Sequence, residues 1–453
     1  MRITIFGTGY VGLVQGACMA DLGHDVLCID INQEKIKKLN KGEVPFYEPG
    51  LSDLIQRNAK QGRLQFSLDA KRGIEFSTAI FIAVGTPQSL NGQADLSAVW
   101  TVAKEIGKNM KEYKVIVNKS TVPPLTAQKV REIIEKNLKE NIKFSVVSNP
   151  EFLREGSAVK DFLIPDRIVI GIEPGDEDAK KIMLKMYDAL ARTDKPIMFT
   201  DTTTSETIKY AANAMLASKI SFMNELSHYV EKTGANIKEI ARGIGLDNRI
   251  GPRFLQAGCG YGGACFPKDI QALIYEMKQN NLSSEMLEAI ESVNEKQKKS
   301  IIKKVNHLLP NLKNKTIGIW GLSFKPNTDD IRQAPSKTII NDLLKQGAKI
   351  KTFDPEAMEN SQKEIIKDPD QKSRVESRDQ NGRKTIEYCK NPYEVTKKID
   401  LLILVTEWNV FKEIDMQKVK ESMKTANLID CRNVYNPNEM RELGFNYISI
   451  GRP

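Results

Sequence analysis

Arg2-Ile3-Thr4-Ile5-Phe6-Gly7-Thr8-Gly9-Tyr10-Val11-Gly12 is the stretch that decides the fold. It predicts a buried strand that runs into three glycines, and a helical pattern continues to Leu22. Residues 26–30 then form a second apolar run that ends in a carboxylate. A G-x-G-x-x-G pattern alone is weak evidence. A dinucleotide-binding unit is indicated here because the glycines follow a strand and begin a helix, and a second strand ends in an acid about 20 residues on.

The glycines and Asp30 supply the expected contacts of this unit. Gly7, Gly9 and Gly12 permit the turn and a close approach to a pyrophosphate, which the helix N-terminus would bind. Asp30 would hold the ribose hydroxyls of the adenosine and repel a 2′-phosphate, so NAD is favoured over NADP. The alternative for Asp30 is a solvated acid at the end of a strand.

Three more apolar runs, at residues 78–84, 115–117 and 144–147, each end in small polar residues. Ligands of parallel sheets bind beyond the carboxyl ends of the strands. We therefore expect Thr86, Thr121 and Glu151 to face the nicotinamide and the reacting carbon. A helix cap is the alternative for either threonine.

Thr203-Thr204-Ser205-Glu206 matches a capping box, so a long helix is expected from Thr207 to about Lys232. Lys209 and Asn213 are one turn apart on a face that is otherwise apolar. Such polar groups are costly without partners, and a developing oxyanion would be one. A lysine that extends along the rim to reach solvent is the alternative.

Gly258-Cys259-Gly260-Tyr261-Gly262-Gly263-Ala264-Cys265-Phe266-Pro267-Lys268-Asp269 is the stretch richest in chemistry. Its glycines let a backbone approach a ligand closely, and the proline fits the first turn of a helix. Cys265 would lie just outside that helix, where the N-terminus and Lys268 favour a thiolate. Asp269 would return to the same face as the thiol. The alternative is a glycine-rich turn beside an inert buried thiol.

The second half of the chain repeats the strand-then-glycine pattern at residues 315–326, with strands expected at 349–353, 401–405 and 426–430. Lys325 and Arg332 are candidate anion contacts. The predicted fold class is α/β, with two doubly wound Rossmann-like domains joined by a long central helix. The predicted regions are a cofactor domain (1–200), a helical central and dimerisation region (201–308) and a nucleotide-binding domain (309–453). Residues 359–392 have mixed charge and predict a mobile surface excursion.

Composition excludes several classes of protein. The 453 residues are 40% hydrophobic and 28% charged, which is typical of globular domains. No apolar run is long enough to span a membrane, and the N-terminus is not a signal peptide. The six cysteines and three histidines lack metal-ligand spacing, so we expect no metal site and reduced thiols in a cytoplasmic protein. The net charge of +9 is spread along the chain, which fits an acidic substrate without nucleic acid.

Taken together, these motifs resemble the nucleotide-sugar dehydrogenases along nearly the whole chain. The motifs are residues 7–12, Lys119-Ser120-Thr121-Val122-Pro123, Asn149-Pro150-Glu151-Phe152-Leu153-Arg154-Glu155-Gly156, Ile208-Lys209-Tyr210-Ala211-Ala212-Asn213-Ala214, residues 262–269 and residues 318–325. Residues 249–258, 388–393 and 405–408 are similar to the members that act on UDP-glucose. The resemblance implies a homodimer and a cytoplasmic enzyme whose product, UDP-glucuronate, supplies polysaccharide biosynthesis.

The resemblance also implies a four-electron oxidation of a primary alcohol to a carboxylate, with two NAD and one water. Cys265 would attack the aldehyde to give a thiohemiacetal and then a thioester. Lys209 and Asn213 would stabilise the oxyanion, and Lys209, or a water ordered by Asp269, would help to remove the first proton. Water positioned by Thr121, Glu151 and Asp269 would hydrolyse the thioester.

The binding residues follow from the same resemblance. The implied NAD contacts are Tyr10, Val11, Asp30, Lys35, Thr86, Thr121, Glu155, Lys268 and Arg332. The implied contacts of the nucleotide sugar are Glu151, Phe152, Leu153, Arg154, Glu155, Lys209, Asn213, Phe254, Leu255, Gln256, Ala257, Gly258, Gly262 and Lys325, with Arg249 crossing from the other subunit. The alternatives are a relative acting on UDP-N-acetylmannosamine or GDP-mannose, a two-step dehydrogenase without a nucleotide substrate, and a basic nucleic-acid-binding protein.

Overall fold

The computed structural model describes residues 1–191, 195–364 and 385–452. The chain forms two compact units, Met1–Ala212 with Gln271–Leu282, and Asn213–Ile270 with Ser283–Pro453. Helices α9 (Thr202–Thr233) and α11 (Phe266–Gln279) each contribute residues to both units. The division into regions 1–200, 201–308 and 309–453 stays a prediction.

The first unit is built on a sheet with the strand order β3-β2-β1-β4-β5-β6-β7-β8. Its strands in the described residues are β1 (Arg2–Phe6), β2 (Asp25–Ile29), β3 (Leu64–Ser67), β4 (Ala79–Ile82), β5 (Val115–Asn118), β6 (Ser145–Ser148), β7 (Ile168–Gly171) and β8 (Ile197–Thr200). Pairing is parallel from β3 through to β6. The order reverses direction at β1 and β4, which is the doubly wound arrangement that the sequence predicts.

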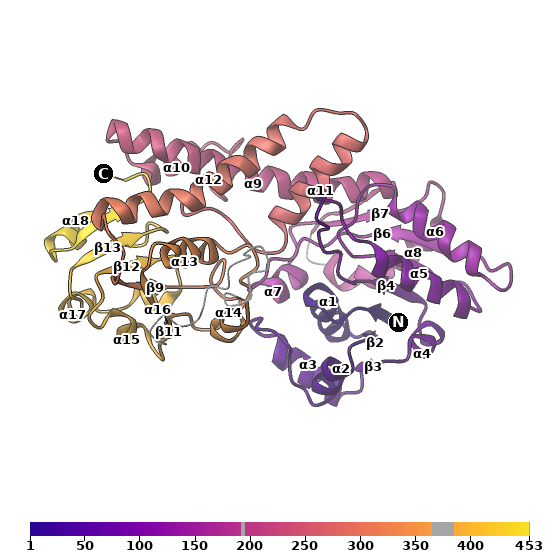
Figure 1. The fold of residues 1–453 in the computed structure, drawn as a ribbon. Helices are drawn as coiled ribbons and strands as arrows, with labels where there is room; N and C mark the ends of the chain where they lie inside the picture. The colour runs from indigo at the N-terminus through magenta and orange to yellow at the C-terminus, as the bar shows by residue number, and fades with distance from the viewer. Residues whose placement is uncertain (192–194, 365–384, 453) are drawn as a thin grey trace. The chain divides into compact units, whose positions relative to one another are not determined.

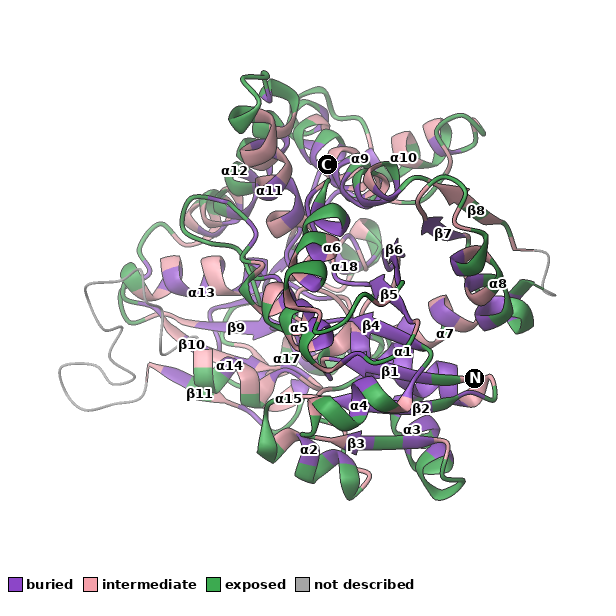
Figure 2. Ribbon diagram, turned by 90° about the vertical axis from the view of Figure 1, so that its right-hand side faces the viewer, coloured by how far each residue is buried: buried purple, intermediate pink, exposed green. Residues whose placement is uncertain are grey.

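Successive residues of these strands face opposite sides of the sheet. Ile3 and Ile5 pack in one core, whereas Phe6 packs in the other, and Figure 2 shows the strands β1, β4 and β5 as buried. The helices that cover the sheet are α1 (Tyr10–Asp21), α2 (Gln33–Asn40), α3 (Leu51–Lys60), α7 (Ala158–Leu163) and α8 (Glu177–Ala191) on the first side, and α4 (Ala70–Phe76), α5 (Ser97–Asn109) and α6 (Thr126–Asn137) on the second.

The second unit contains a parallel sheet with the order β11-β10-β9-β12-β13-β14, so it repeats the same winding. Figure 1 labels β9, β12 and β13 of this sheet. Its strands are β9 (Thr316–Trp320), β10 (Lys349–Phe353), β11 (Ile386–Tyr388), β12 (Leu401–Leu404), β13 (Asn427–Asp430) and β14 (Asn446–Ser449) in the described part of the chain. The two doubly wound domains of the predicted fold are therefore confirmed.

Two cores cover the faces of this second sheet. One core includes side chains of α9, α10 (Ile237–Gly245), α12 (Glu285–Leu308) and α13 (Pro335–Lys345). The other includes side chains of α15 (Pro392–Thr396), α16 (Asn409–Lys412), α17 (Met416–Ser422) and α18 (Pro437–Glu442). The loops that follow β9 and β12 lie at the reversal point of the strand order, where ligands of such sheets bind.

The structure corrects the predicted start of α9. This helix begins at Thr202, and the side chain of Asp201 accepts hydrogen bonds from the Thr204 amide (2.8 Å) and hydroxyl (2.6 Å). Asp201 therefore caps the helix, and the capping box assigned to Thr203 and Glu206 is wrong. Glu206 instead accepts a hydrogen bond of 2.8 Å from the Ala127 amide, in the first turn of α6.

The segment 359–392 is also more regular than the sequence indicates. Its beginning belongs to α14 (Met358–Glu364) and its end includes β11 and the start of α15. Residues 365–384 lie outside the described residues. In the described parts of the chain, no helix combines the length and the apolar character needed to cross a bilayer.

Glu206→Gln tests the link between α9 and α6. Burial raises the pKa of Glu206 to about 8, against the effect of the amides of Ala127, Thr126 and Leu125. The folded state therefore holds a proton that the unfolded state loses above pH 4.5, so wild-type stability falls as pH rises from about 5 to 8. Glutamine keeps the acceptor without the charge. We expect the variant to lose this pH dependence, a change on the order of a few degrees in the thermal midpoint.

Glu132→Gln is the matched control, because Glu132 lies on α6 with a side chain that is 50% exposed. The same pH dependence in wild type and Glu206→Gln would contradict the interpretation.

Candidate active site

The candidate cofactor edge of the first unit is the turn between β1 and α1. Gly9 caps α1 without a side-chain hydrogen bond, so the first amides of the helix are available to an anion. A Cβ placed on Gly9 would have no heavy atom within 4 Å, whereas one on Gly12 would collide with the Gly7 carbonyl. Gly12 thus packs tightly against the protein, whereas the space beside Gly9 is open, as a turn that binds a pyrophosphate requires.

Asp30 follows β2 and is held against this turn. Its Oδ2 accepts hydrogen bonds from the Thr8 amide (2.8 Å) and hydroxyl (2.7 Å), and Lys35 Nζ lies 3.6 Å from it. Burial alone would raise the pKa of Asp30, but the bonds from Thr8 and Asn32 and the charge of Lys35 lower it overall. The side chain is 11% exposed, so an ionised carboxylate lies at the expected ribose position.

Other predicted cofactor residues of the first unit also meet. Thr86 Oγ1 donates a hydrogen bond of 2.9 Å to the carbonyl of Thr121, so the loops after β4 and β5 are joined. Tyr10 stacks on Phe46, and its hydroxyl accepts a bond of 2.8 Å from the Gly156 amide. This bond connects α1 to the residue that follows Glu155.

Lys209 and Glu151 form a buried ion pair in the first unit. Lys209 Nζ donates to Glu151 Oε1 at 2.9 Å, and both side chains are 5% exposed. The interpretation of Lys209 as a rim lysine is therefore wrong, and its partner is a carboxylate of the protein. Burial alone would raise the pKa of Glu151, but Lys209, the Leu153 amide and Lys119 lower it overall.

Aromatic contacts support this pair. The ring of Phe152 lies 5.4 Å from Lys209 Nζ and 3.6 Å from the Arg167 guanidinium. Arg154 pairs with Asp161 at the surface. Sequence reasoning missed Arg167, because an arginine before a strand carries no signal of its own.

Cys265 caps α11 in the second unit, since its carbonyl accepts a bond of 2.9 Å from the Asp269 amide. Asp269 is buried; its carboxylate accepts one bond from Asn213 Nδ2 and another from Lys268 Nζ, each at 2.6 Å. The predicted thiol, amide, ammonium and carboxylate are therefore gathered around the first turn of one helix.

The other thiols have different surroundings. All six cysteines lie in the described part of the chain; Cys265 is partly exposed, and the other five are buried. Burial, aided by a nearby acid, raises the pKa of Cys28 to about 12 and that of Cys389 to about 11. Among these side chains, Cys265 is the one a substrate can reach.

The loop before Cys265 is clamped by three carboxamides that sequence reasoning missed. Asn224 Oδ1 accepts from the Gly258 amide (2.8 Å), and Gln297 Nε2 donates to the Gly258 carbonyl (2.5 Å). Asn294 bonds both the amide and the carbonyl of Tyr261, at 2.8 and 3.2 Å. The sequence does contain one sign of two of these carboxamides. Asn294 and Gln297 are polar residues of α12 that lie between apolar residues one helical turn away in each direction.

The glycines of this loop are required by contacts within the protein. Gly263 has a φ of 82°, and a Cβ there would lie 2.9 Å from the ring of Phe324. A Cβ on Gly262 would collide with the carbonyl of Gln333. The glycine backbone therefore approaches atoms of the second unit itself, namely the carbonyl of Gln333 and the ring of Phe324. Contact of Gly262 with a ligand stays a prediction.

The second sheet has its own acid after its second strand, Asp354, which is fully buried. Its Oδ2 accepts from the amides of Leu322 and Ser323 and from Trp408 Nε1, at 2.7 to 3.1 Å. Its Oδ1 accepts from the amides of Glu356 and Ala357. Asp354 is therefore saturated by the protein, in contrast to the partly exposed Asp30.

Other predicted residues of the second unit make contacts of their own. Lys325 Nζ is 5.3 Å from the ring of Phe324, and Arg332 pairs with Asp330 at 2.7 Å. Phe254 has an uncommon positive φ of 65° and its ring lies 6.2 Å from that of Phe266. The side chain of Arg249 is 88% exposed, and its guanidinium is bonded to Asp247.

The predicted residues therefore fall into two sets, each with its own geometry. The first unit holds Asp30, Lys35, Thr86, Thr121, Glu151 to Glu155 and Lys209; the second holds Asn213, Arg249, Phe254 to Gly258, Gly262, Cys265, Lys268, Asp269, Lys325 and Arg332. Lys209 and Asn213 are one turn apart on α9.

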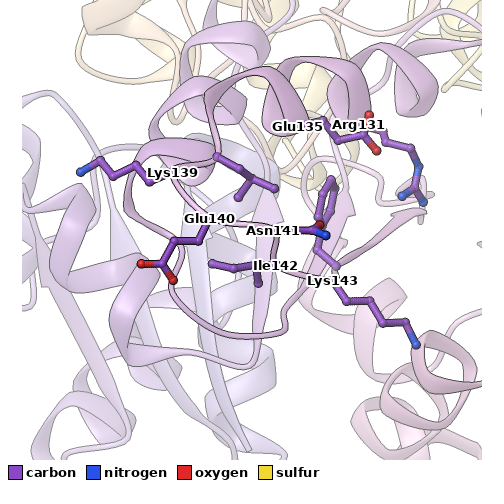
Figure 3. A pocket seen from close by; sticks show the side chains of 9 residues that line it. Arg131, Glu135, Lys139, Glu140, Asn141, Ile142 and Lys143 are labelled. Atoms are coloured by element: carbon purple, nitrogen blue, oxygen red, sulfur yellow. The ribbon is translucent and has the colours of Figure 1, made fainter.

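A surface pocket of the first unit lies between the end of α6 and Phe144, and Figure 3 shows its lining side chains. Lys139 and Lys143 extend outward from it in different directions. None of its lining residues belongs to the predicted set, so the candidate chemistry lies elsewhere.

Comparison with known proteins agrees with this arrangement. Residues 1–191 match the NAD binding domain of the UDP-glucose/GDP-mannose dehydrogenase family, residues 203–296 its central domain and residues 318–437 its UDP binding domain. The chain is 44% identical to UDP-glucose 6-dehydrogenase of Rhizobium meliloti, with 100% of both chains covered. It is 42% identical to a UDP-glucose 6-dehydrogenase of Bacillus subtilis, with 100% of this chain and 93% of the relative covered.

Among solved structures, a UDP-glucose dehydrogenase from the archaeon Pyrobaculum islandicum superposes with a TM-score of 0.89 at 34% identity, covering 100% of this chain and 98% of the other. The chain belongs to the UDP-glucose/GDP-mannose dehydrogenase family.

Proposed function

We propose that this protein oxidises UDP-glucose to UDP-glucuronate, using two NAD and one water. Full-length identity to UDP-glucose 6-dehydrogenases supports the substrate. The observation that carries the chemistry is the partly exposed Cys265 directly before α11, a helix whose first turn bears Lys268 and Asp269, with Asn213 bonded to Asp269. A helix N-terminus and an ammonium both favour a thiolate nucleophile.

The first unit fits NAD. The open side of the turn at Gly9 suits the pyrophosphate, and Asp30, next to Lys35, suits the adenosine ribose. Thr86 and Thr121, which are bonded to each other, would face the nicotinamide together with Glu155. When bound, NAD supplies the acceptor for one hydride in each oxidation. Lys268 and Arg332 remain proposed cofactor contacts by resemblance.

In the proposed first oxidation, Lys209 takes the proton of the C6 hydroxyl as the hydride departs. The alcohol becomes an aldehyde and Lys209 becomes an ammonium. Glu151 holds Lys209 in position through the 2.9 Å bond. Asp269, which orients Asn213, could instead act through a water.

In the proposed second oxidation, the thiolate of Cys265 adds to the aldehyde carbon and forms a thiohemiacetal oxyanion. Lys209 and Asn213 stabilise this oxyanion by charge and by an N–H donor. Loss of hydride leaves a thioester. Water, positioned by Thr121, Glu151 and Asp269, then adds to the carbonyl, and the C–S bond breaks. Carboxylate and thiolate are released, and the two protons of the water pass to solvent. Covalent attachment prevents escape of the aldehyde.

The nucleotide sugar would be bound by the loop that the carboxamides clamp, residues 254–258 and Gly262, together with residues 151–155 and Lys325. The bonds to Asn224, Gln297 and Asn294 support this proposal, because a fixed loop loses little conformational entropy when it binds.

We also propose a homodimer. Met215, Phe222 and Tyr229 are spaced by seven residues on α9 and are 61%, 56% and 67% exposed. An apolar stripe of this kind on a helix is typical of an interface. Arg249, which is almost fully exposed, would reach the substrate of the other subunit. A cytoplasmic location is proposed because a catalytic thiol needs a reducing compartment.

The substrate is tested by measuring NADH formed per nucleotide sugar. We expect two NADH for each UDP-glucose and much lower rates with UDP-N-acetylmannosamine and GDP-mannose. Turnover of another sugar without turnover of UDP-glucose would move the protein to a different branch of its family.

Cys265→Ser tests the covalent step. The variant should stall during or after the first oxidation, since a hydroxyl at this position is a far weaker nucleophile than a thiolate. Quenched wild-type enzyme should carry the sugar on Cys265 in a mass spectrum. Cys389→Ser is the control, because Cys389 is a buried thiol outside the set. Two NADH per sugar from Cys265→Ser would remove the thiol from the mechanism.

Phe222→Glu tests the interface. A buried unpaired charge disfavours association, so we expect monomers by light scattering and loss of the activity that depends on Arg249 of the second subunit. Leu90→Glu is the matched control, since Leu90 is fully exposed in the first unit. An intact dimer in Phe222→Glu would place the interface elsewhere.

A further inference from the structure

Lys119 is a buried cation that the proposed mechanism leaves unused. It directly follows β5, and Asn149 directly follows the neighbouring strand β6. Lys119 is 6% exposed, and its Nζ donates to Asn149 Oδ1 at 3.2 Å. The same oxygen accepts a bond of 2.6 Å from the Tyr187 hydroxyl, and Asn149 Nδ2 donates to the Val169 carbonyl. Asn149 is thus held by Tyr187 of α8 and Val169 of β7, and it in turn holds the ammonium of Lys119.

Lys119 lies in the electric field of the Glu151–Lys209 pair. Its ammonium interacts electrostatically with Glu151 and with Lys209, which form an ion pair with each other. Glu151 thus attracts two buried ammonium groups, and these two groups repel each other. Among the described residues, Tyr187 and Arg167 also face this cluster: burial keeps Tyr187 protonated by raising its pKa, and Arg167 interacts with Glu151 from the segment before β7. The charge of Asp166 acts on Arg167 more strongly than that of Glu151 does.

A buried charge of this kind costs stability. Burial lowers the pKa of Lys119 to about 8; Glu151 opposes the shift and Lys209 adds to it. A lysine kept in such a place at the edge of a ligand-binding sheet is typical of a functional site. Because repulsion between like charges is mutual, Lys119 also makes it easier for Lys209 to lose its proton.

We propose that Lys119 is a positioning residue for the Glu151–Lys209 pair: its ammonium, held by Asn149, keeps Glu151 ionised and favours release of the Lys209 proton. Lys209, which Glu151 alone would hold protonated, is thereby made a better base for the proposed first oxidation. This inference rests on the proposed role of Lys209 in the first oxidation.

Lys114 provides a matched control at the other end of the same strand. It directly precedes β5, is 1% exposed and is bonded to the Ser77 carbonyl and to Glu112. Lys114→Met and Lys119→Met thus each remove one buried ammonium from β5. Only the second variant removes a charge that acts on Glu151 and Lys209.

The experiment is the pH profile of kcat/KM for NADH formation from UDP-glucose. In Lys119→Met the acid limb should move to higher pH by roughly one unit, with a corresponding tenfold loss of rate on that limb. Lys119→Arg should restore the wild-type limb, and Lys114→Met should leave it in place. If Lys119→Met does not fold, Lys119→Gln, whose amide can still donate to Asn149, carries the same expectation.

Thermal unfolding separates this role from a structural one. The folded state disfavours the proton on Lys119, so wild-type stability should rise with pH between about 8 and 10.5. Lys119→Met should lose that rise and be at least as stable as wild type at pH 7. The proposal would be overturned if the acid limb of Lys119→Met stays at the wild-type pH, whether or not the thermal midpoint at pH 7 falls.

Lys209→Met separates failure of this inference from failure of the proposed mechanism. It should abolish most of the rate together with the acid limb. If Lys209→Met remains active, the role of Lys209 itself is refuted. If it is inactive and the limb of Lys119→Met does not move, the role of Lys119 alone is refuted.

Discussion

Parallel strand pairing is the constraint on which this structure depends. Each parallel connection must return through a helix, so the strands β1 to β6 of the first sheet, and all six strands of the second, end at the same edge of their sheet. The strands β7 and β8 run the other way, because β7 pairs antiparallel with β6. Thr121 and Glu151 are far apart in the sequence, and this constraint brings their loops to one edge.

The second determinant is the need to pair polar groups that are buried. Two consecutive turns of α9 bear Lys209 and Asn213, and each reaches a carboxylate, Glu151 and Asp269 respectively. Neither carboxylate is left without a donor, and neither donor faces a purely apolar core. Lys119 extends the same logic, since its charge acts on both Glu151 and Lys209. The proposed catalytic groups would thus be tuned by their neighbours.

Much of the fold could be predicted because strong local patterns coincide with it. The strands β1, β9 and β10 lie where their apolar runs predict them, and Cys265 caps a helix as the following proline indicates. The strands β3, β7, β8, β11 and β14 were not predicted. Length and composition do not explain every case, because β7 has four buried residues, as the predicted β12 does. The incorrect capping box shows a second limit of prediction from sequence. Asp201 accepts the hydrogen bonds that cap α9, and the carboxylate of Glu206 instead accepts one from the first turn of α6.

The site was harder to predict wherever partners come from distant segments. Lys209 could be recognised as an unusual residue from its helix face, but its carboxylate partner lies 58 positions away. Asn224, Asn294 and Gln297 act on backbone atoms of residues 258 and 261, and a sequence pattern does not record which backbone a carboxamide reaches. The motif at residues 262–269 was recognisable because all its parts are consecutive.

The saturated state of Asp354 has a consequence for the order of events. The second sheet has the winding of a dinucleotide-binding sheet, yet its acid offers no free oxygen to a ribose. In the proposed reaction, which consumes two NAD per sugar, only the first unit would then bind the cofactor. The first NADH would leave and a second NAD would enter while the half-oxidised sugar stays attached to Cys265, so this covalent bond would have to outlast the exchange.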